Sequence, residues 1–312
     1  MKRDPAPTLD RVKAYEMVRR LVEEGTERRP ATLSVRLKEA GLIVPSRMTI
    51  RRWVNDTNSP VSILRRFEPV PSEELSFFVA AWIADGWGDE NDGGKRMRLK
   101  VRSRTFAEEF ARCASVILSK SKPYRVWTTS DEGGTWYNVK ATSLELFAFA
   151  NRDLESLKET ISQNPRGFLR GLFTAEGCPC ISLSTKRNLR LDVGITISNT
   201  DVALLELARR LLLDLGIRTG GMKINRRAGE RTNLSVALHS EWQFTVSARD
   251  DVLRFARSVG FADLTKQTKL DDGLRMIFEV GPAAAADRWR LAYEKKGRIW
   301  VRKDGTGAPT FA

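Results

Sequence analysis

The chain has 312 residues, 41% of them hydrophobic, and a formal net charge of +14 at pH 7. This length and composition allow two ordinary folded domains, each with its own core. Such a positive charge attracts polyanions, so nucleic acid is the expected partner. No run approaches the roughly 20 apolar residues that cross a bilayer, and no basic amphipathic segment has an aromatic face, so no membrane partner is expected. The charged, proline-containing start lacks a signal peptide's apolar run, which predicts a cytoplasmic protein.

Cysteine and histidine usage narrows the possible chemistry. Cys113, Cys178 and Cys180 are odd in number and lack the paired spacing of a zinc ribbon, so we interpret them as ordinary thiols. His239 is the single histidine, which argues against a Ser-His-Asp arrangement. Carboxylates, a metal ion and lysine remain as the means of cleaving a phosphodiester.

The N-terminal region has the pattern of three short helices. Apolar residues recur at helical spacing from Leu9 to Gly25, and a second helical run from Leu33 to Ala40 is followed by a glycine. A third helix is expected after Ser46, a good capping residue, with Ile50 and Trp53 on its buried side.

The third helix would carry three arginines on its outer side, namely Arg47, Arg51 and Arg52. This arrangement resembles a helix-turn-helix unit, whose second helix binds DNA. A basic three-helix bundle with a structural role is the alternative. Prolines then mark a linker around residues 56–72, so we predict a helical N-terminal domain over residues 1–68.

Two later segments, residues 77–86 and 168–177, align with each other without a gap. Each is an apolar helix with small residues, at which a second backbone could approach closely. Each ends in Ala-acid-Gly, and we expect the glycine to take the left-handed conformation that closes a helix. Asp85 and Glu176 then lie at the negative end of a helix dipole, which disfavours a carboxylate and calls for a positive partner. A divalent cation shared by the two carboxylates would supply it.

Both segments resemble the LAGLIDADG motif of homing endonucleases. Asp85 and Glu176 match its acidic position, and Gly86 and Gly177 match its last position. The resemblance covers roughly residues 72–280 and implies that these four residues form the catalytic metal site. It also implies Mg²⁺ as the cofactor, with Mn²⁺ or Ca²⁺ able to substitute in binding.

The sequence after each motif alternates between apolar and polar residues, as a half-buried strand does. In residues 96–102 the apolar side is Met97, Leu99 and Val101, and the other side is wholly cationic. Residues 189–198 alternate in the same way with a mixed polar side. A cationic sheet face can lie along phosphates and enter the major groove. An exposed basic strand without a partner is the alternative interpretation.

Further elements follow each of these strands in the same order. We expect helices at 106–119 and 202–215, and strands at 124–129, 136–141, 222–225, 234–239 and 242–248, each set being followed by a helix. The family resemblance implies an α+β fold of tandem αββαββα LAGLIDADG halves with pseudo-twofold symmetry, preceded by the small all-α helix-turn-helix-like domain. We place the halves at 72–160 and 161–281 and a C-terminal tail at 282–312. A chain with both motifs is expected to be a monomer.

Lysines commonly complete such sites. The resemblance implies Lys266 as a catalytic residue, Lys158 as its first-half counterpart, and Lys100 near the scissile phosphate. The candidate DNA-binding residues on the strands or beside them are Arg96, Arg98, Lys100, Arg102, Arg104, Arg125, Asn138, Lys140, Arg190, Asp192, Thr196, Ser198, Lys223 and Asn225.

The function implied is a site-specific, metal-dependent double-strand DNA endonuclease that leaves short 3′ overhangs and serves intron homing. Its partner would be double-stranded DNA with a long pseudo-palindromic or asymmetric target site. Two alternatives remain open: a DNA-binding regulator that uses the same scaffold without cutting, and an RNA-splicing maturase.

Overall fold

A computed structural model describes residues 8–55, 67–89, 96–120, 122–184, 189–231, 236–297 and 299–304. The chain divides into two compact units. The first comprises residues 1–68, 87–98 and 141–151, and the second comprises residues 69–86, 99–140 and 152–312. None of the helices in the described part of the chain combines the length and apolarity needed to cross a membrane.

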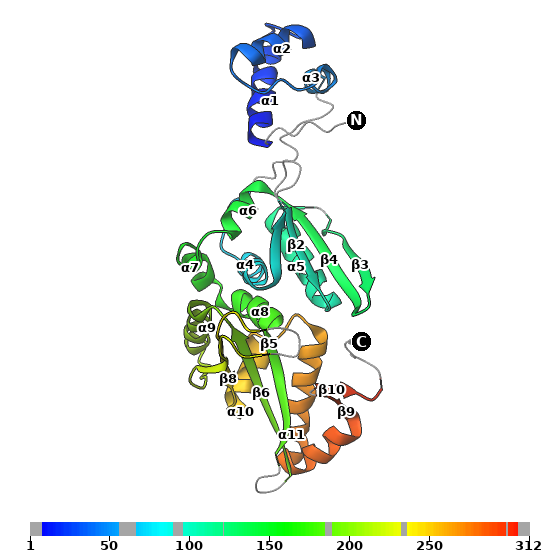
Figure 1. The fold of residues 1–312 in the computed structure, drawn as a ribbon, viewed down its shortest axis with the longest axis vertical. Helices are drawn as coiled ribbons and strands as arrows, with labels where there is room; N and C mark the ends of the chain where they lie inside the picture. The colour runs from blue at the N-terminus through cyan, green and yellow to red at the C-terminus, as the bar shows by residue number, and fades with distance from the viewer. Residues whose placement is uncertain are drawn as a thin grey trace. The chain divides into compact units, whose positions relative to one another are not determined.

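The N-terminal region folds as three helices, α1 (Thr8–Glu23), α2 (Pro30–Glu39) and α3 (Arg47–Val54) (Figure 1). The predicted cap is present, because the Ser46 hydroxyl accepts a hydrogen bond from the Thr49 amide at 3.2 Å. Ile50 and Trp53 are buried in a small core with residues of α1 and α2, and Tyr15 meets Trp53 edge to face at 5.5 Å. Most of the predicted linker, residues 56–66, lies outside the described residues.

The first αββαββα set follows the predicted order. Its elements are α4 (Glu73–Asp85), β1 (Gly86–Asp89), β2 (Arg96–Val101), α5 (Arg104–Ile117), β3 (Val126–Asp131), β4 (Gly134–Thr142), α6 (Leu144–Ala150) and α7 (Leu154–Gln163). The four strands form one sheet in the order β1-β2-β4-β3. The predicted alternation in β2 is confirmed, because Met97, Leu99 and Val101 are buried and the residues between them are not.

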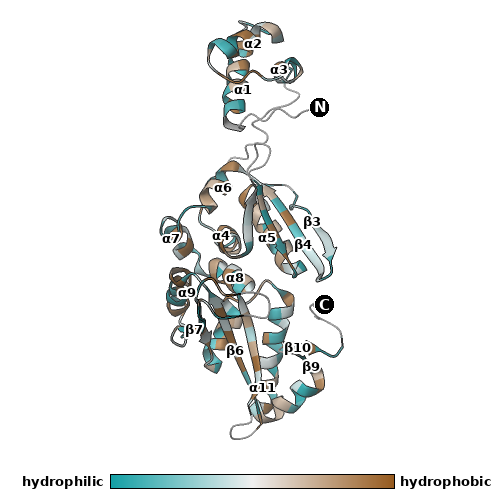
Figure 2. Cartoon of the chain, in the orientation of Figure 1, coloured by the Kyte–Doolittle hydropathy of each residue, from teal (hydrophilic) through white to brown (hydrophobic). Residues whose placement is uncertain are grey.

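The second set repeats this arrangement. Its elements are α8 (Pro165–Glu176), β5 (Gly177–Ser184), β6 (Arg190–Asn199), α9 (Val202–Asp214), β7 (Lys223–Arg226), β8 (Glu241–Val246) and α10 (Arg249–Ser258). The strand order β5-β6-β8-β7 is the same as in the first sheet. Apolar and polar residues are interspersed along the helices and strands of both sets (Figure 2). The predicted tandem α+β fold is therefore confirmed.

The C-terminal part packs against the second set. Helix α11 (Leu264–Ala292) is kinked at Gly281, whose φ of 77° is left-handed, and β9 (Tyr293–Lys296) pairs with β10 (Ile299–Arg302). Trp289 and Tyr293 share a core with Leu191 of β6. Residues beyond the predicted boundary at 281–282 therefore complete the core of the second half.

One strand prediction differs from the structure, and two strands were not predicted. The expected strand over residues 234–239 begins at positions outside the described residues. An isolated bridge pairs Arg231 with Val236, and residues 237–240 after it form a loop instead of a strand. Strands β1 and β5 were not located from the sequence. The first half of β5 contains Cys178, Pro179 and Cys180 in place of the β-branched and aromatic residues that usually indicate a strand.

Candidate active site

The two motif helices, α4 and α8, pack directly against each other. A Cβ added to Gly171 would lie 2.6 Å from the Phe77 carbonyl oxygen and 2.9 Å from the Ala80 Cβ, and one added to Gly167 would clash with the Glu73 carbonyl. These glycines let the two backbones approach closely along the contact. The prediction that small residues permit this approach is confirmed.

Each motif helix ends on its acidic residue, Asp85 in α4 and Glu176 in α8. The prediction that the following glycines are left-handed is wrong, because Gly86 has φ −81° and Gly177 has φ −91°, and the chain passes straight into a strand. The glycines are needed for space instead. A Cβ on Gly86 would lie 2.5 Å from the Trp82 ring, and one on Gly177 would lie 2.7 Å from the Phe173 carbonyl oxygen.

Burial and nearby charges shift the pKa values of both carboxylates. Burial raises the pKa of Glu176 to about 7, and the negative charge of Asp85 is the second cause of that rise. The pKa of Asp85 is also raised, mainly by partial loss of surrounding water, although the residue is exposed. The positive charge of Lys266 opposes both shifts. The structure therefore brings together Asp85, Glu176 and Lys266, three of the five catalytic residues that the sequence predicted.

Lys266 provides the positive group at the end of α8. Its ammonium donates hydrogen bonds to the carbonyl oxygens of Thr174 at 2.6 Å and Gly177 at 2.7 Å. The last carbonyls of a helix have no partner within the helix and carry its negative partial charge, so a cation there is favourable. Burial lowers the pKa of Lys266, and nearby acidic groups, Asp85 and Glu176 among them, oppose that effect.

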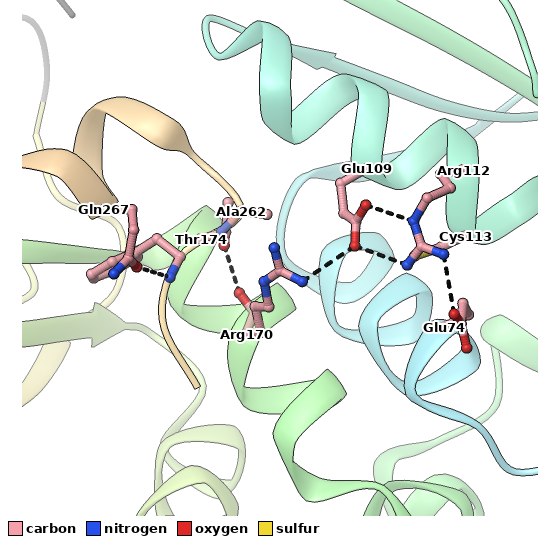
Figure 3. A network of polar contacts seen from close by, with 9 residues as sticks. Glu74, Glu109, Arg112, Cys113, Arg170, Thr174, Ala262 and Gln267 are labelled. Atoms are coloured by element: carbon pink, nitrogen blue, oxygen red, sulfur yellow. Dashed lines mark hydrogen bonds and ion pairs between the residues drawn. The ribbon is translucent and has the colours of Figure 1, made fainter. Parts of the chain in front are cut away.

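The loop before α11 holds Lys266 in place. Asp263 caps the helix by accepting hydrogen bonds from the Thr265 amide at 2.8 Å and the Lys266 amide at 3.3 Å. The Thr174 hydroxyl accepts from the Ala262 amide at 2.8 Å, which fixes the loop to α8 (Figure 3). The start of α11 is therefore tied to the helix whose end its lysine contacts.

An ion-pair network fastens α5 to both motif helices. Glu109 on α5 lies between the guanidinium groups of Arg112, at 2.8 Å, and Arg170 of α8, at 3.4 Å (Figure 3). Arg112 also reaches Glu74 of α4 at 3.1 Å. The two arginines hold the pKa of Glu109 below its usual value despite its burial. The network fixes the relative position of the helices that carry the two acids.

Sequence reasoning missed Asn199. Its side-chain amide donates a hydrogen bond to the Glu176 carboxylate at 3.0 Å, from the last position of β6. Asn199 stands two residues before the helix cap Asp201, and the residue two before the corresponding cap Ser103 is the buried Val101. An alignment of the two repeats places the polar Asn199 opposite the apolar Val101, and this difference is the signal that could have revealed Asn199.

The structure does not bring Lys158 to the carboxylate pair. Its ammonium pairs with Glu155 on the same helix, α7. A hydrogen bond of 3.2 Å from the Ser76 hydroxyl to the Thr160 carbonyl places this helix beside the start of α4. Ser76 precedes Asp85 by nine residues, which is about 13 Å along a helix.

The first sheet has a cationic face, but not a wholly cationic one. The ammonium of Lys100 lies 3.9 Å from a carboxylate oxygen of Asp131 and 4.7 Å from the centre of the Trp136 ring. Arg102 stacks on the same ring at 3.6 Å and lies 3.7 Å from Asp131. The aromatic ring and the carboxylate were not foreseen from the alternation in β2 alone.

The other first-half candidates are spread over several elements. Arg96 and Arg98 are half-buried on β2, and Lys140 is half-buried on β4. Arg125 is exposed before β3, and exposed Arg104 pairs with Glu108 at 2.7 Å. Asn138 is buried, and its amide donates to the Thr129 hydroxyl at 3.0 Å, so it is occupied within the sheet.

The second sheet presents a polar face made from alternate residues of its strands. Strand pairing sets Thr196 opposite Cys178, Asp192 opposite Ser182, and Ser198 opposite Gln243. Glu241 accepts hydrogen bonds from Ser198 at 2.6 Å and from Asn225 at 3.1 Å.

The remaining candidates of this half are charged. Arg190 lies 3.1 Å from Asp192. Lys223 is exposed at the start of β7. The face therefore mixes both charge signs with hydroxyl and amide groups, as its sequence predicted.

Comparison with known protein families finds a match for one part of the chain. Residues 163–260 match the family of LAGLIDADG-like domains. This part of the chain is therefore similar to a LAGLIDADG-like domain. It contains Glu176 and Asn199, whereas Asp85 and Lys266 lie on either side of it.

Similar proteins extend the comparison beyond the LAGLIDADG-like domain. An uncharacterised protein of Methanocaldococcus jannaschii is 25% identical over 231 residues, which are 72% of this chain and 80% of that protein. A crystal structure of I-DmoI in complex with DNA and Mn is 19% identical, with a TM-score of 0.42, over 61% of this chain and 98% of that chain. Full-length DUF199/WhiA from Thermatoga maritima is 17% identical, with a TM-score of 0.40, over 72% of this chain and 68% of that chain.

The helical N-terminal region precedes the LAGLIDADG-like domain in sequence and carries its own group of basic residues. Arg47, Arg51 and Arg52 are exposed on α3, while the other side of that helix is buried. This is the arrangement that the sequence predicted for a helix that can contact DNA.

Proposed function

We propose that the chain is a site-specific, metal-dependent double-strand DNA endonuclease of the homing type. The observation that carries the proposal is the convergence of Asp85 and Glu176 at the ends of two packed helices, with Lys266 beside both. A carboxylate whose pKa is raised by burial and by the charge of a second acid, as that of Glu176 is, is typical of sites that bind a cation or exchange protons. Duplication of the αββαββα set supports a pairing of each half with one DNA strand.

The donor atoms at this site fit Mg²⁺. The described residues contain no group of three or more His, Cys, Asp or Glu side chains suited to a metal, so the chain would supply the two carboxylates. Mg²⁺ commonly binds through one or two carboxylates and substrate phosphates. The carbonyls of Gly86 and Gly177 are the further candidate ligands, although Gly177 already accepts a hydrogen bond from Lys266. Mn²⁺ or Ca²⁺ would substitute in binding.

Asp85 and Glu176 would hold the cation, which supplies charge neutralisation at the phosphate and activation of water. The chain's own groups then position this site. Asn199 orients the Glu176 carboxylate through its amide. Lys266 fixes the end of α8 and offsets the negative charge of both acids. A double-strand break with short 3′ overhangs would follow from one acid acting at each strand.

We propose that double-stranded DNA lies on the polar faces of the two sheets. Lys100 and Arg102 would contact phosphates, while the mixed groups around Ser198 and Asn225 could read base edges. The arginines of α3 would add a second contact outside the cleavage site. A chain with two halves would act as a monomer on a long, pseudo-palindromic or asymmetric target.

A DNA-binding regulator without cleavage is the second candidate function. It is favoured by the ammonium of Lys266, which already provides a cation at the end of α8. In that case the carboxylates and lysine would form a structural ion cluster, and DNA would bind without being cut.

One experiment separates these functions. The protein is incubated with Mg²⁺ and a plasmid carrying the DNA that spans the gene's own insertion point, and linear product is measured beside DNA binding. Wild type should cut, and the double variant Asp85→Asn, Glu176→Gln should bind but not cut. Glu132→Gln, in an exposed turn, is the matched control and should cut normally. Binding without cutting by wild type would support the regulator, and cutting by the double variant would contradict the catalytic assignment.

A further inference from the structure

Two exposed cysteines follow the second acidic motif, and the proposed mechanism does not use them. Cys178 and Cys180 lie on β5 with their sulfur atoms 4.0 Å apart. Cys113, in contrast, is buried on α5. Alternate residues of a strand point to the same side, so both thiols are on the polar sheet face. That face is the one proposed to bind DNA.

A disulfide between the two cysteines requires β5 to bend. Residues two apart in a strand have Cα atoms about 6.6 Å apart, near the upper limit of the range of about 4.4–6.8 Å that disulfides span, and their Cβ atoms must come within about 4.5 Å of each other. The sulfurs would have to approach by about 2 Å to reach the bond length of about 2.05 Å. Strand β5 is at the edge of its sheet and is paired only with β6 among the described strands, so it can bend to allow this.

Closure of this bond would disturb the neighbouring residues. The Cys180 thiol is held 3.2 Å from the Thr196 hydroxyl, and that contact would be altered. Cys178 directly follows Gly177, whose carbonyl accepts the hydrogen bond from Lys266. A change in the direction of β5 at Cys178 would therefore shift Gly177, which follows Glu176 in the chain and binds Lys266 through its carbonyl oxygen.

We propose that Cys178 and Cys180 form a redox modification site, in which a low-molecular-weight disulfide converts the two thiols to an internal disulfide that impairs the adjacent carboxylate site. The formation of the disulfide is inferred from the positions of the two thiols alone. The impairment of cleavage rests on the proposed endonuclease function.

The reaction balances as a thiol–disulfide exchange. One cysteine thiolate attacks a sulfur of the small disulfide, releases one small thiolate, and forms a mixed disulfide. The second cysteine then attacks the protein sulfur of that bond, and the second small thiol leaves. The protein loses two protons and two electrons, which the small disulfide takes up as it becomes two small thiols.

The chemical step is tested without DNA. The full chain is treated with oxidised glutathione, alkylated under native conditions, and digested for peptide mass spectrometry. The peptide with both cysteines should lose two hydrogens and resist alkylation until dithiothreitol is added, and Cys113 should stay a thiol. Cys178→Ser and Cys180→Ser should each retain a glutathione adduct instead. A persistent glutathione adduct on wild type, or two alkylated thiols, would overturn the proposal.

The functional step is measured with the same samples. Oxidation should lower the Mg²⁺-dependent cleavage rate about 100-fold, as a displacement of about 1 Å in a catalytic group can do. Dithiothreitol should restore the rate, and the double variant Cys178→Ser, Cys180→Ser should be insensitive. Full cleavage by protein with the disulfide would overturn the regulatory part. A reduced protein that never cuts would instead contradict the endonuclease proposal, while the mass measurement would still decide the disulfide.

Discussion

Replacing Glu176 by glutamine should stabilise the protein at alkaline pH. The fold raises the pKa of Glu176 from 4.5 to about 7 through burial and the charge of Asp85. A folded state that holds this proton more tightly than the unfolded chain gains stability that is complete below about pH 4.5. That stability is lost as the pH rises through 7. At pH 8 wild type therefore carries an unfavourable ionised carboxylate, which glutamine does not have.

The shift gives the magnitude of the effect. A rise from 4.5 to about 7 corresponds to about 3 kcal/mol at full strength. The Glu176 side chain is only partly buried, and solvent screening reduces this to about 1–2 kcal/mol. With an unfolding entropy of about 2.1 cal/mol/K per residue, about 1 kcal/mol moves the melting temperature of this 312-residue chain by roughly 1.5 °C. The variant Glu176→Gln should therefore melt about 1.5–3 °C higher than wild type at pH 8.

Thermal unfolding followed by circular dichroism, with EDTA present, checks this expectation at pH 4.5 and pH 8. The advantage of Glu176→Gln should be present at pH 8 and absent at pH 4.5, where the wild-type group is protonated. Glu132→Gln, at an exposed turn, should match wild type at both values. An equal advantage at the two pH values, or a loss of stability at pH 8, would refute the electrostatic argument.

The other expectations are measured more simply. Lys266→Met leaves the carbonyl oxygens of Thr174 and Gly177 without their donor, so the melting temperature should fall, and cleavage should fall about 100-fold in a plasmid assay. Gly171→Ala forces a Cβ against the Phe77 carbonyl and should cost about 1–3 kcal/mol in urea unfolding, whereas Gly221→Ala, with open space around it, should not. Removing three basic side chains from α3 should lower the slope of log affinity against log salt by about 3 in a DNA titration, and an unchanged slope would make the helix structural. The three changes are Arg47→Ala, Arg51→Ala and Arg52→Ala.

Local chemistry explains which features could be predicted from the sequence. Ser46 caps α3 through a contact three residues away, and the alternation of Met97, Leu99 and Val101 records the two faces of one strand. The ends of the motif helices were likewise visible, because Asp85 and Glu176 occupy matching positions of a repeated pattern. Each of these signals lies within one element or between two aligned copies of it.

Features that depend on distant parts of the chain were not predictable in the same way. The partners of Lys266 lie about 90 residues earlier in the sequence and are backbone carbonyls, which no residue type reveals. Asn199 contacts Glu176 only because β6 runs beside the end of α8. Asp131 and Trp136 contact the cationic side chains of Lys100 in β2 and Arg102 just after it, and they do so from two other strands.

The site is asymmetric although the fold around it is duplicated. The Glu176 carboxylate accepts a hydrogen bond from Asn199, whereas a buried valine, Val101, holds the corresponding place in the first half. Lys266 comes from α11, which follows the second αββαββα set, yet its charge acts on both Asp85 and Glu176. Because one lysine serves two acids, losing either acid changes the environment of the other. The unit of function in the proposed endonuclease is therefore the carboxylate pair with its shared lysine, and not two independent copies of one motif.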